Sequence, residues 1–496
     1  MTSSTLSTAI SAASSAPAVI VPSTPPLTVS FRQLAADVRA FQQRLAELGI
    51  GHGDAVSIAL PNNYEFVVAF LAVAAQRAIA APLNPAYKQS EFEFYIDDLS
   101  SAVALVPRGA VARAEASVKA ADLGKLASRS PQPLLTASPS DVALVLHTSG
   151  TTGRPKAVPL THRNLTRTMD NIQATYDLSP ADRTYLVMPL FHVHGLLAGF
   201  LAPLKSGGSV IIPPKFSATT FWTDFATHRA NWYTAVPTIH QILLKNPAPH
   251  PLPSIRFIRS CSSALSPKTL HDLEATYNAP VLEAYAMTEA AHQMCSNPLP
   301  SRGPHKPGTV GRGQGVEVRI LAPHPDNTEQ ADGSEGEISI RGENVTSGYI
   351  NNPKANAESF TPDGFFRTGD QGKKDADGYI IITGRIKELI NRGGEKISPI
   401  ELDNALTAMP GVAEAVSFGI PDELMGQIIG VAIVAKASSA SITDKDVKSF
   451  VASRLAKHKV PSRVWLLKEI PKTATGKVQR RKVAETLLAR DSKAKL

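Results

Sequence analysis

Apolar and polar positions near the start of the chain alternate in blocks of helical and strand-like spacing. Over 30–48 the apolar residues recur at helical spacing, which predicts an amphipathic helix that ends at Gly51 and Gly53. The apolar run 55–60 follows and is typical of a buried strand. A second helix is predicted over 66–75, so this part of the chain alternates between helix and strand.

The same alternation continues through the middle of the chain. Short apolar runs predict further buried strands at 102–106, 183–188, 209–212 and 255–260. Helices that alternate with such strands favour an α/β fold, in which helices are layered on parallel sheets. Around 317–320 and 337–341, short strands with glycine turns indicate a β-rich segment.

The pattern changes after a strand predicted over 379–383. The segments that follow predict helix, strand, strand and helix at 399–409, 415–419, 429–435 and 444–455. The stretch from 386 to 496 is long enough for a compact α+β domain, so we place a domain boundary at 385–387. The predicted organisation is a flexible lead-in at 1–26, an N-terminal domain at 27–385 and a small C-terminal domain at 386–496.

Composition limits the class of protein. With 496 residues, 43% hydrophobic and 19% charged, the chain matches a globular enzyme with one large and one smaller domain. The longest apolar stretch, 66–75, is too short to span a bilayer. Two cysteines, Cys261 and Cys295, exclude a disulfide framework and a cysteine-based metal site, and they fit an intracellular compartment. The net charge of +8 is spread along the chain, which disfavours a nucleic-acid partner and suits anionic small substrates.

The two ends of the chain bear on its location in the cell. No Lys or Arg precedes Arg32, which argues against a signal peptide or a mitochondrial presequence. The last three residues, Ala494, Lys495 and Leu496, resemble the Ser-Lys-Leu peroxisomal address with Ala in place of Ser. We therefore expect a peroxisomal protein recognised by an import receptor. The alternative is a cytoplasmic protein with a frayed basic tail.

A loop rich in glycine and hydroxyl residues follows the apolar run 142–146. Its glycines let backbone N–H groups turn toward an anion, and its hydroxyls and lysine add donors and charge. The predicted phosphate-binding residues are Thr148, Ser149, Gly150, Thr151, Thr152, Gly153 and Lys156. The loop differs from a Walker A motif, because Ala157 follows Lys156 where that motif has Ser or Thr. The loop therefore does not indicate a P-loop NTPase, and an ordinary polar surface loop is the alternative.

Five segments in order resemble the core motifs of the adenylate-forming superfamily, which contains acyl-CoA synthetases, firefly-type luciferases and the adenylation domains of peptide synthetases. They are the loop 148–156, the segment 285–289, the triplet 368–370, the segment 384–387 and the late segment 471–477. The match in order and spacing runs over about residues 30–485. It implies an enzyme that uses ATP to activate a carboxylic acid and then passes the acyl group to CoA, with a C-terminal domain that is mobile.

The resemblance implies how ATP is held. The loop would grip the β- and γ-phosphates, Thr288 would reach phosphate, and Glu289 would ligate Mg²⁺, a cation that prefers oxygen ligands. Asp370 would accept hydrogen bonds from the ribose, and Arg385 would lie near ribose and phosphate. The residues expected beside the adenine are Ser263, Ala264, Glu283, Ala284 and Tyr285. Each residue taken singly has an ordinary alternative. Glu289 could be an acid on the surface, Tyr285 could pack in the core, and Asp370 could be a turn residue.

The resemblance also implies a second reaction step. Lys477 would enter the site during adenylation and bridge the acyl carboxylate and the phosphate, a role that suits a mobile point charge. Lys387 would act as the hinge, and Gly393 and Gly394 would let the pantetheine arm of CoA pass close to the backbone. A solvated lysine and a plain Gly-Gly turn are the alternatives.

The acid pocket is expected at His194, Ser262 and His292 by the same resemblance. Histidines and a hydroxyl suit a second carboxylate better than an alkyl chain, because a buried anion needs donors or positive charge. The segments 261–265 and 285–294 most resemble the oxalate–CoA ligase group, which implies a small dicarboxylic acid, oxalate. Alternatives are histidines that bond within the core, a coumarate- or medium-chain-type CoA ligase and, more distantly, a basic nucleic-acid-binding protein.

Overall fold

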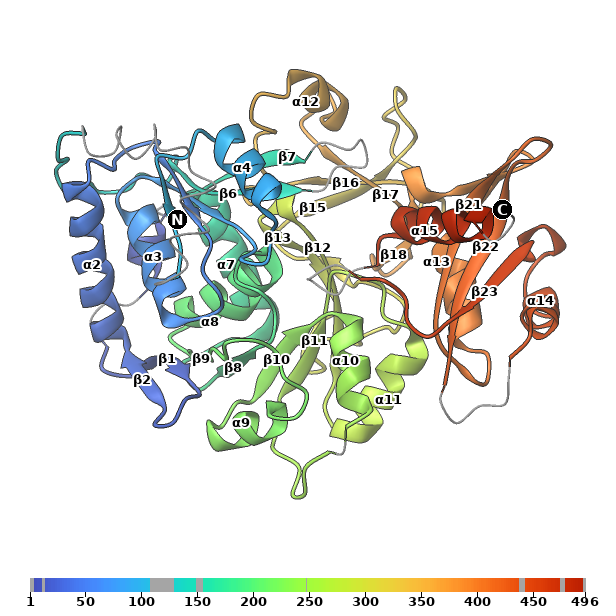
Figure 1. Cartoon of the computed structure of the whole chain (residues 1–496), viewed down its shortest axis with the longest axis horizontal. Helices are drawn as coiled ribbons and strands as arrows, with labels where there is room; N and C mark the ends of the chain where they lie inside the picture. The colour runs from blue at the N-terminus through green and yellow to red at the C-terminus, as the bar shows by residue number, and fades with distance from the viewer. Residues whose placement is uncertain are drawn as a thin grey trace.

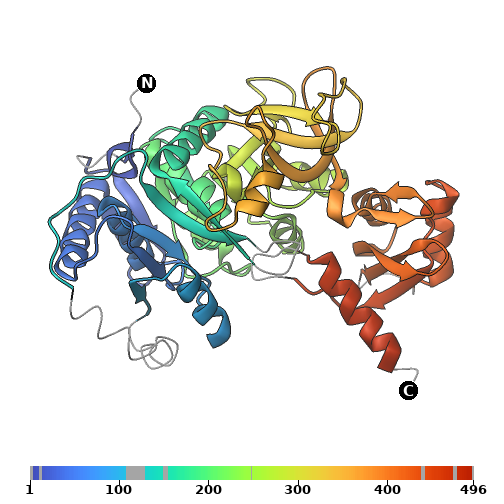
Figure 2. The same ribbon diagram turned by 90° about the horizontal axis from the view of Figure 1, so that it is seen from above.

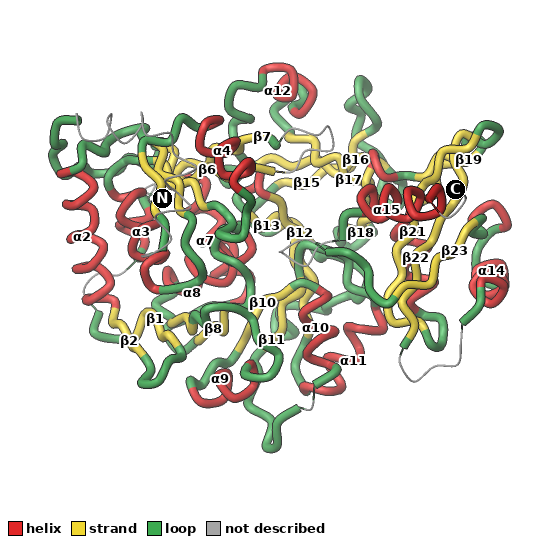
Figure 3. The backbone as a smooth tube through the Cα atoms, in the orientation of Figure 1, coloured by secondary structure: helices red, strands yellow, loops and turns green. Residues whose placement is uncertain are grey.

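The computed structural model describes residues 4–10, 14–107, 129–148, 155–246, 248–436, 442–472 and 478–493. Within these ranges the strands form four sheets, three before the hinge candidate Lys387 and one after it (Figures 1 and 3). The expected α/β architecture is confirmed: helices are layered on sheets in a large N-terminal part, and a small α+β part follows.

The largest sheet has nine strands, several of which were predicted from short apolar runs. They are β1 (Pro17–Val21), β2 (Leu27–Ser30), β8 (Arg183–Leu186), β9 (Ser209–Ile211), β10 (Trp232–Ala235), β11 (Phe257–Ser260), β12 (Val281–Met287), β13 (His292–Ser296) and β14 (Arg312–Gly313). Their order across the sheet is β14-β13-β12-β11-β10-β8-β9-β1-β2. Strands β8 to β12 pair in parallel, as expected for strands that alternate with helices.

Strand β1 comes from the segment expected to be a flexible lead-in, and that expectation is wrong for the described residues. The apolar side chains of 18–20 are buried where β1 pairs with β9. A short helix, α1 (Leu6–Ala9), precedes this strand. Leu6 is buried, and its backbone N–H donates to Nδ1 of His162 at 3.1 Å. Burial of these few apolar residues holds the segment in place despite the Ser- and Pro-rich sequence around them.

A second sheet shares its hydrophobic core with the first. Its strands are β3 (Ala55–Ile58), β4 (Ile79–Pro82), β5 (Val103–Leu105), β6 (Val142–Thr148) and β7 (Lys156–Thr161), in the order β5-β3-β4-β6-β7. Helices α3 (Tyr64–Ala75) and α7 (His162–Tyr176) add Phe70 and Met169 to one core cluster that contains residues of both sheets. These two helices therefore form a layer between the sheets.

Capping residues set the starts of the two helices predicted near the N-terminus. Ser30 accepts from the N–H of Gln33 at the start of α2 (Phe31–Glu47), and Asn63 does the same for Phe66 in α3. The other helices of the N-terminal part are α4 (Gln89–Asp98), the π-helix η1 (His194–Leu201), α8 (Ala202–Lys205), α9 (Phe221–Thr227), α10 (Pro237–Leu244), α11 (Pro267–Tyr277), the 3-10 turn η2 (Thr288–Ala290) and α12 (Pro353–Ser359). Helices α9, α10 and α11 lie along the bottom of Figure 1 and share a second core cluster with β8 to β11. No helix within the described ranges is long and apolar enough to cross a membrane.

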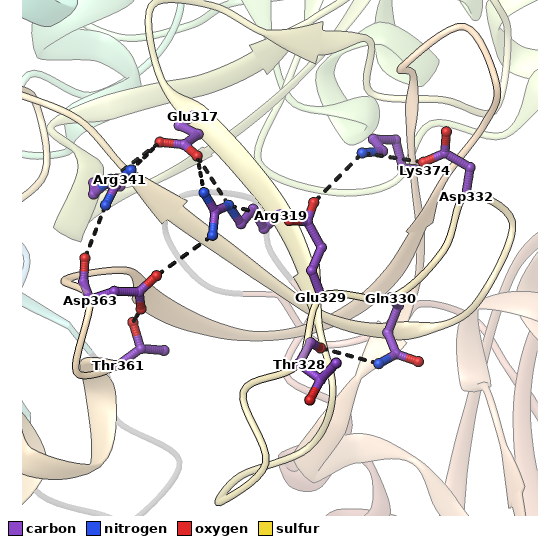
Figure 4. A network of polar contacts seen from close by, with 10 residues as sticks. All are labelled: Glu317, Arg319, Thr328, Glu329, Gln330, Asp332, Arg341, Thr361, Asp363 and Lys374. Atoms are coloured by element: carbon purple, nitrogen blue, oxygen red, sulfur yellow. Dashed lines mark hydrogen bonds and ion pairs between the residues drawn. The ribbon is translucent and has the colours of Figure 1, made fainter.

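The predicted β-rich segment forms a four-stranded antiparallel sheet. Its strands are β15 (Glu317–Leu321), β16 (Gly336–Arg341), β17 (Phe366–Lys374) and β18 (Ile380–Arg385). Charged side chains on this sheet form the exposed ion-pair network, which comprises Glu317, Arg319, Glu329, Asp332, Arg341, Asp363 and Lys374 (Figure 4). Nη2 of Arg319 lies 2.8 Å from Oε1 of Glu317, and Nη2 of Arg341 lies 2.7 Å from Oε2 of the same carboxylate. The side chains of Arg319 and Glu317 are 32% and 41% exposed, so water reaches the network.

The C-terminal part has its own sheet and its own core. Its elements are the 3-10 turn η3 (Ile386–Glu388), β19 (Ile390–Arg392), β20 (Glu395–Ile397), α13 (Pro399–Thr407), β21 (Val412–Asp422), β22 (Gly426–Ala435), α14 (Asp444–Ala452), the 3-10 turn η4 (Lys457–Lys459), β23 (Arg463–Leu467) and α15 (Arg480–Lys493). The sheet order is β20-β19-β22-β21, and β23 pairs with β22. Apolar residues of the sheet pack against α13 and α14 on one face and against α15 on the other. Figure 2 shows this part beside the large N-terminal part, and the four elements predicted between 399 and 455 are all present.

Candidate active site

The predicted phosphate loop joins two paired strands. Thr148 at the end of β6 is the register partner of Lys156 at the start of β7. The β6–β7 hairpin therefore holds the two ends of the loop side by side. The residues between them, Ser149, Gly150, Thr151, Thr152 and Gly153, lie outside the part of the chain that the structure describes. Their contacts with phosphate stay predictions.

Lys156 and Glu289 both contact Tyr349. Nζ of Lys156 lies 4.4 Å from the centre of the Tyr349 ring, and the Tyr349 hydroxyl donates to Oε1 of Glu289 at 2.9 Å. Burial raises the pKa of the Glu289 carboxyl, although the Tyr349 hydrogen bond and the charge of Lys156 oppose the rise. Burial also lowers the pKa of Lys156, and the nearby charge of Lys387 lowers it further. The buried carboxyl of Glu289, which follows the half-buried Thr288, thus lies near the ammonium group of Lys156 at the C-terminal end of the loop.

Asp370 contacts two other residues predicted to bind the nucleotide. The hydroxyl of Tyr285 on β12 donates to Oδ2 of Asp370, and Nε of Arg385 lies 3.2 Å from Oδ1. Burial raises the pKa of the Asp370 carboxyl, while the charge of Arg385 and the Tyr285 hydrogen bond oppose the rise. The Arg385 side chain is 58% exposed, so its guanidinium remains accessible to a ligand. The structure brings these three residues together as expected, and their roles toward ribose and adenine stay predictions.

The remaining adenine-site candidates lie on β12 and just after β11. Glu283 and Ala284 are buried on β12, and the N–H of Gly308 donates to Oε2 of Glu283 at 3.0 Å. Burial raises the pKa of Glu283 to about 8. Ser263 and Ala264 follow β11 and are exposed. A ligand can therefore reach Ser263 and Ala264, whereas the carboxylate of Glu283 is already bonded within the chain.

The three acid-pocket candidates form one cluster. Nδ1 of His194 lies 3.0 Å from Oγ of Ser262. The rings of His194 and His292 are stacked, with centroids 5.2 Å apart. Both histidines are buried and Ser262 is half-buried. His194 is the first residue of the π-helix η1, a type of helix that is frequent at functional sites. The cluster gathers imidazole and hydroxyl groups, the donors that a buried carboxylate requires.

Two of these residues have a backbone conformation that favours glycine. The φ angle is +75° at Ser262 and +101° at His292. A non-glycine residue held in such a region costs about 1–3 kcal/mol, and this strain is concentrated at functional sites. The protein therefore keeps a hydroxyl and an imidazole at positions where glycine would be less strained.

A set of polar residues behind His194 was missed by the sequence analysis. Oγ1 of Thr234 lies 2.6 Å from Nε2 of His194, and Nη1 of Arg259 donates to the same Oγ1 at 3.1 Å. The missed residues are Tyr176, Thr234, Arg259 and Gln293, and together with the predicted His194 and Ser262 they form what we name the buried polar cluster. One signal in the sequence could have revealed this cluster. Arg259 lies in the apolar run 255–260, which predicts a buried strand, and a buried arginine needs polar partners nearby.

The C-terminal candidates occupy the turn regions of that part. Lys387 is exposed in η3. Gly393 and Gly394 form the turn between β19 and β20 with φ of +59° and +91°, which glycine adopts without strain. A Cβ atom at Gly393 would lie 2.9 Å from Cε of Met425, the end of a flexible side chain that can move aside, so the positive φ is what favours glycine there. Lys477 lies outside the described residues, and its predicted role is untouched by the structure.

The donor set around Glu289 fits Mg²⁺. No group of three or more His, Cys, Asp and Glu side chains suited to a metal ion occurs in the described ranges. Mg²⁺ does not need such a group, since it binds through one or two carboxylates together with substrate phosphates and water. The buried carboxylate of Glu289 lies beside the hairpin that carries the predicted phosphate loop, so this one carboxylate and the phosphates of a bound nucleotide could together meet that requirement.

Comparison with known proteins identifies relatives of this chain along most of its length. Residues 8–350 match the model of the AMP-binding enzyme family, and residues 401–477 match its C-terminal domain. The oxalate–CoA ligase of Saccharomyces cerevisiae is 48% identical over an alignment of 516 positions, gaps included, which covers 95% of this chain and 94% of the relative. The oxalate–CoA ligase of Arabidopsis thaliana is 50% identical over 474 aligned residues, covering 91% of each chain. The crystal structure of ATP-bound MatB from Rhodopseudomonas palustris superposes with a TM-score of 0.87 at 30% identity, covering 95% of this chain and 96% of that one. The chain belongs to the AMP-binding enzyme family.

Proposed function

We propose that this chain is an AMP-forming oxalate–CoA ligase. In the first step an oxalate oxygen forms a bond to the α-phosphorus of ATP, and the bond from that phosphorus to pyrophosphate breaks. In the second step the sulfur of CoA forms a bond to the acyl carbon, and AMP leaves. The observation that carries the proposal is the cluster of His194, Ser262 and His292, and the similarity to two oxalate–CoA ligases supports it.

The nucleotide would lie between the loop and Asp370. Negative charge grows on the phosphate oxygens as pyrophosphate leaves, so cations and N–H donors must surround that centre. Lys156 and Arg385 supply cations, and the loop residues Thr148 to Gly153 supply donors with Thr288. Asp370 would accept hydrogen bonds from the ribose hydroxyls, while Tyr285 packs along the adenine.

Glu289 is the residue that would hold Mg²⁺. When bound, this ion neutralises charge on the phosphate oxygens and orients them. The chain contributes a carboxylate whose direction is fixed by the hydroxyl of Tyr349 at 2.9 Å. The charge of Lys156 acts against the burial that raises the pKa of Glu289, and so favours the ionised form that a cation requires.

Oxalate would be held by its second carboxylate. One carboxylate must face the α-phosphorus, and the other then lies in the pocket, where it needs donors to replace water. The hydroxyl of Ser262 and the imidazole of His292 would supply them, and His194 would act through the hydroxyl of Ser262, with which its Nδ1 is in contact at 3.0 Å. A monocarboxylic acid would bring no acceptor for the donors of this pocket, and sites built to hydrogen-bond a polar group of the substrate reject analogues that lack it.

The C-terminal part would serve both steps. We retain 27–385 and 386–496 as the domain limits, with Lys387 as the hinge, because β18 ends at Arg385 and the next core lies beyond it. Lys477 would enter the site during adenylation and leave it afterwards. Gly393 and Gly394 would then line the path of the CoA arm, because their turn lets a ligand approach the backbone closely.

An acid panel tests the proposal. Purified protein with ATP, Mg²⁺ and CoA is given oxalate, malonate, acetate, octanoate or coumarate, and AMP release is measured. We expect kcat/KM for oxalate to exceed that for each other acid by at least about tenfold. A clear preference for coumarate or a fatty acid would contradict the proposed substrate. In the same assay Lys477→Ala should abolish acyl-AMP formation while thioester formation from supplied oxalyl-AMP continues, and equal loss of both steps would contradict the domain movement.

We also propose that Ala494, Lys495 and Leu496, which lie outside the described residues, address the protein to peroxisomes. A fluorescent fusion with this C-terminus intact should collect in peroxisomes, and removal of the three residues should leave it in the cytoplasm. The same cytoplasmic signal from both fusions would contradict the proposal.

A further inference from the structure

Arg259 is a permanently charged residue in the interior of the large domain. It lies on β11 in the nine-stranded sheet, and its side chain is fully buried. Nε donates to the hydroxyl of Tyr176 at 2.7 Å, Nη2 to Oε1 of Gln293 at 3.2 Å, and Nη1 to Oγ1 of Thr234 at 3.1 Å. These acceptors are neutral, and no Asp or Glu of the described residues forms an ion pair with Arg259. A buried charge without a counter-charge is costly, so its retention calls for an explanation.

Thr234 connects this charge to the acid pocket. Guanidinium N–H groups can only donate, so the hydroxyl oxygen of Thr234 must act as acceptor toward Arg259. The hydroxyl hydrogen is then available for Nε2 of His194, which lies 2.6 Å away. Of the two groups in contact with Oγ1, Arg259 cannot accept and Nε2 of His194 can, so the hydroxyl hydrogen is best placed in an O–H···N bond with the imidazole nitrogen accepting.

This direction fixes the tautomer of His194. A neutral imidazole carries one N–H, and if Nε2 accepts, the proton is on Nδ1. Nδ1 then donates to Oγ of Ser262 at 3.0 Å. The hydroxyl of Ser262 accepts from His194, so its own hydrogen can be donated to a second acceptor. With the opposite tautomer, the Ser262 hydrogen would point at Nδ1 and its lone pairs would face an incoming anion.

We infer that Arg259 is a positioning residue that acts through Thr234 and His194 to present the hydroxyl hydrogen of Ser262 to the distal carboxylate of the acid. This inference rests on the proposed function. All donors in the relay point the same way, from the guanidinium toward the pocket. The relay therefore makes the pocket selective for an acid that brings a hydrogen-bond acceptor to Ser262.

Thr234→Val tests the relay with little change in shape, since it removes the hydroxyl and keeps a branched side chain. Without the Thr234 hydroxyl, His194 no longer orients Ser262, and the hydrogen bond from Ser262 to the distal carboxylate of oxalate is lost. We expect the KM for oxalate to rise by about tenfold or more, while the KM for ATP stays within about twofold. Thr234→Ser keeps the hydroxyl and should restore most of the oxalate affinity. A normal oxalate KM in Thr234→Val would overturn the relay.

Thr184 provides a matched control. It is fully buried on the neighbouring strand β8, where it is the register partner of Trp232, and its hydroxyl has no hydrogen-bond partner within the described ranges. Thr184→Val makes the same change of side chain in the same sheet and should leave the oxalate KM unchanged. An equal rise in both valine variants would show a general packing effect and overturn the relay.

A double variant separates a relay from a structural role. If Thr234 acts through Ser262, then Thr234→Val should raise the oxalate KM by less than about twofold in a Ser262→Ala background. Full additivity of the two substitutions would overturn the relay. A wild-type enzyme that prefers a monocarboxylic acid would overturn the proposed function and this inference with it. An oxalate preference that is insensitive to Thr234→Val would overturn the inference alone.

Discussion

The buried polar cluster around Arg259 and the exposed ion-pair network around Arg319 use the same residue type under opposite conditions. Arg259 has no contact with solvent and donates to three neutral oxygens. Arg319 is 32% exposed and lies within 4 Å of three carboxylates, those of Glu317, Glu329 and Asp363. The interior arginine thus has a set of directional bonds without charge pairing, and the surface arginine has charge pairing that water can replace.

The difference shows which polar groups constrain function. A buried donor or acceptor that loses its partner costs about 1–3 kcal/mol, because no water takes the partner's place. An exposed ion pair contributes about 0–1 kcal/mol and is screened by salt. The interior bonds of Arg259 therefore impose one arrangement of side chains next to the acid pocket. The surface network tolerates many arrangements of its side chains. Glu317, for example, pairs with both Arg319 and Arg341, and water can replace either partner.

The largest expected effect is on how the free energy of unfolding depends on pH, where the interior Glu283 and the exposed Glu317 should act in opposite directions. Burial raises the pKa of Glu283 from its ordinary value of 4.5 to about 8, so the folded protein binds a proton there that the unfolded chain releases. Between these pH values the free energy of unfolding should fall by up to ~1.4 kcal/mol per pH unit as pH rises. Urea denaturation across this range measures the slope, and Glu283→Gln should flatten it. An unchanged slope in the variant would assign the effect to another group.

Glu317 in the exposed ion-pair network should behave in the opposite sense. Hydrogen bonds from Arg341 and then Arg319 lower the pKa of its carboxyl. The stability that it contributes is therefore present above its ordinary pKa of 4.5 and lost as pH falls below that value. Glu317→Gln should change stability by under about 0.5 kcal/mol at neutral pH, because its partners remain solvated.

Arg→Lys exchange tests the comparison directly. Lysine keeps the charge but has one nitrogen, so it cannot reach the three acceptors that surround Arg259. Arg259→Lys should lower the free energy of unfolding by about 2–3 kcal/mol, because buried acceptors lose their donors. Arg319→Lys is the matched control and should cost under about 0.5 kcal/mol. Both are measured by chemical denaturation, and similar costs at the two sites would remove the distinction between them.

Much of the fold was predictable because periodicity is local. The helices at 31–47 and 64–75 follow from apolar spacing with capping residues at their starts. Strand β1 was missed because its few apolar residues lie in a Ser- and Pro-rich segment, and only the neighbouring strand β9 makes them part of a sheet. Pairing with distant strands cannot be read from local pattern.

In the candidate site, too, residues in local motifs were predicted and residues that matter only through distant contacts were missed. Tyr285, Asp370 and Arg385 were expected to lie near one another from their motifs, and the structure places them in contact. Tyr349 and Thr234 were missed because each is an ordinary residue in its own segment. Their importance comes only from contacts across the fold, with Glu289 and Arg259 respectively.

Ser262→Gly trades function for stability. The +75° φ angle at Ser262 suits glycine, so Ser262→Gly should be about 1 kcal/mol more stable to unfolding than Ser262→Ala, which loses the same hydroxyl. It also removes the hydroxyl that we assign to the acid, so the oxalate KM should rise while the ATP KM does not. Asn278→Gly is a matched control, because Asn278 also has a positive φ, of 47°, but lies at the C-terminus of α11, outside the candidate site. It should leave the oxalate KM unchanged, and a Ser262→Gly protein no more stable than Ser262→Ala would show that the backbone there is not strained.

The smallest expected effect belongs to Asp363 in the exposed ion-pair network. Oδ2 of Asp363 lies 3.6 Å from Nη1 of Arg319, and its side chain is 55% exposed (Figure 4). Asp363→Asn keeps the shape, and Glu317 and Glu329 still neutralise Arg319, so the free energy of unfolding should not change measurably. Added salt should remove any remaining difference, since at about 1 M the screening length is near 3 Å. Denaturation of both proteins at low and high salt measures it. A clear loss of stability that persists at high salt would mean that this network is held as rigidly as the interior cluster, and exposure would no longer explain why the two differ.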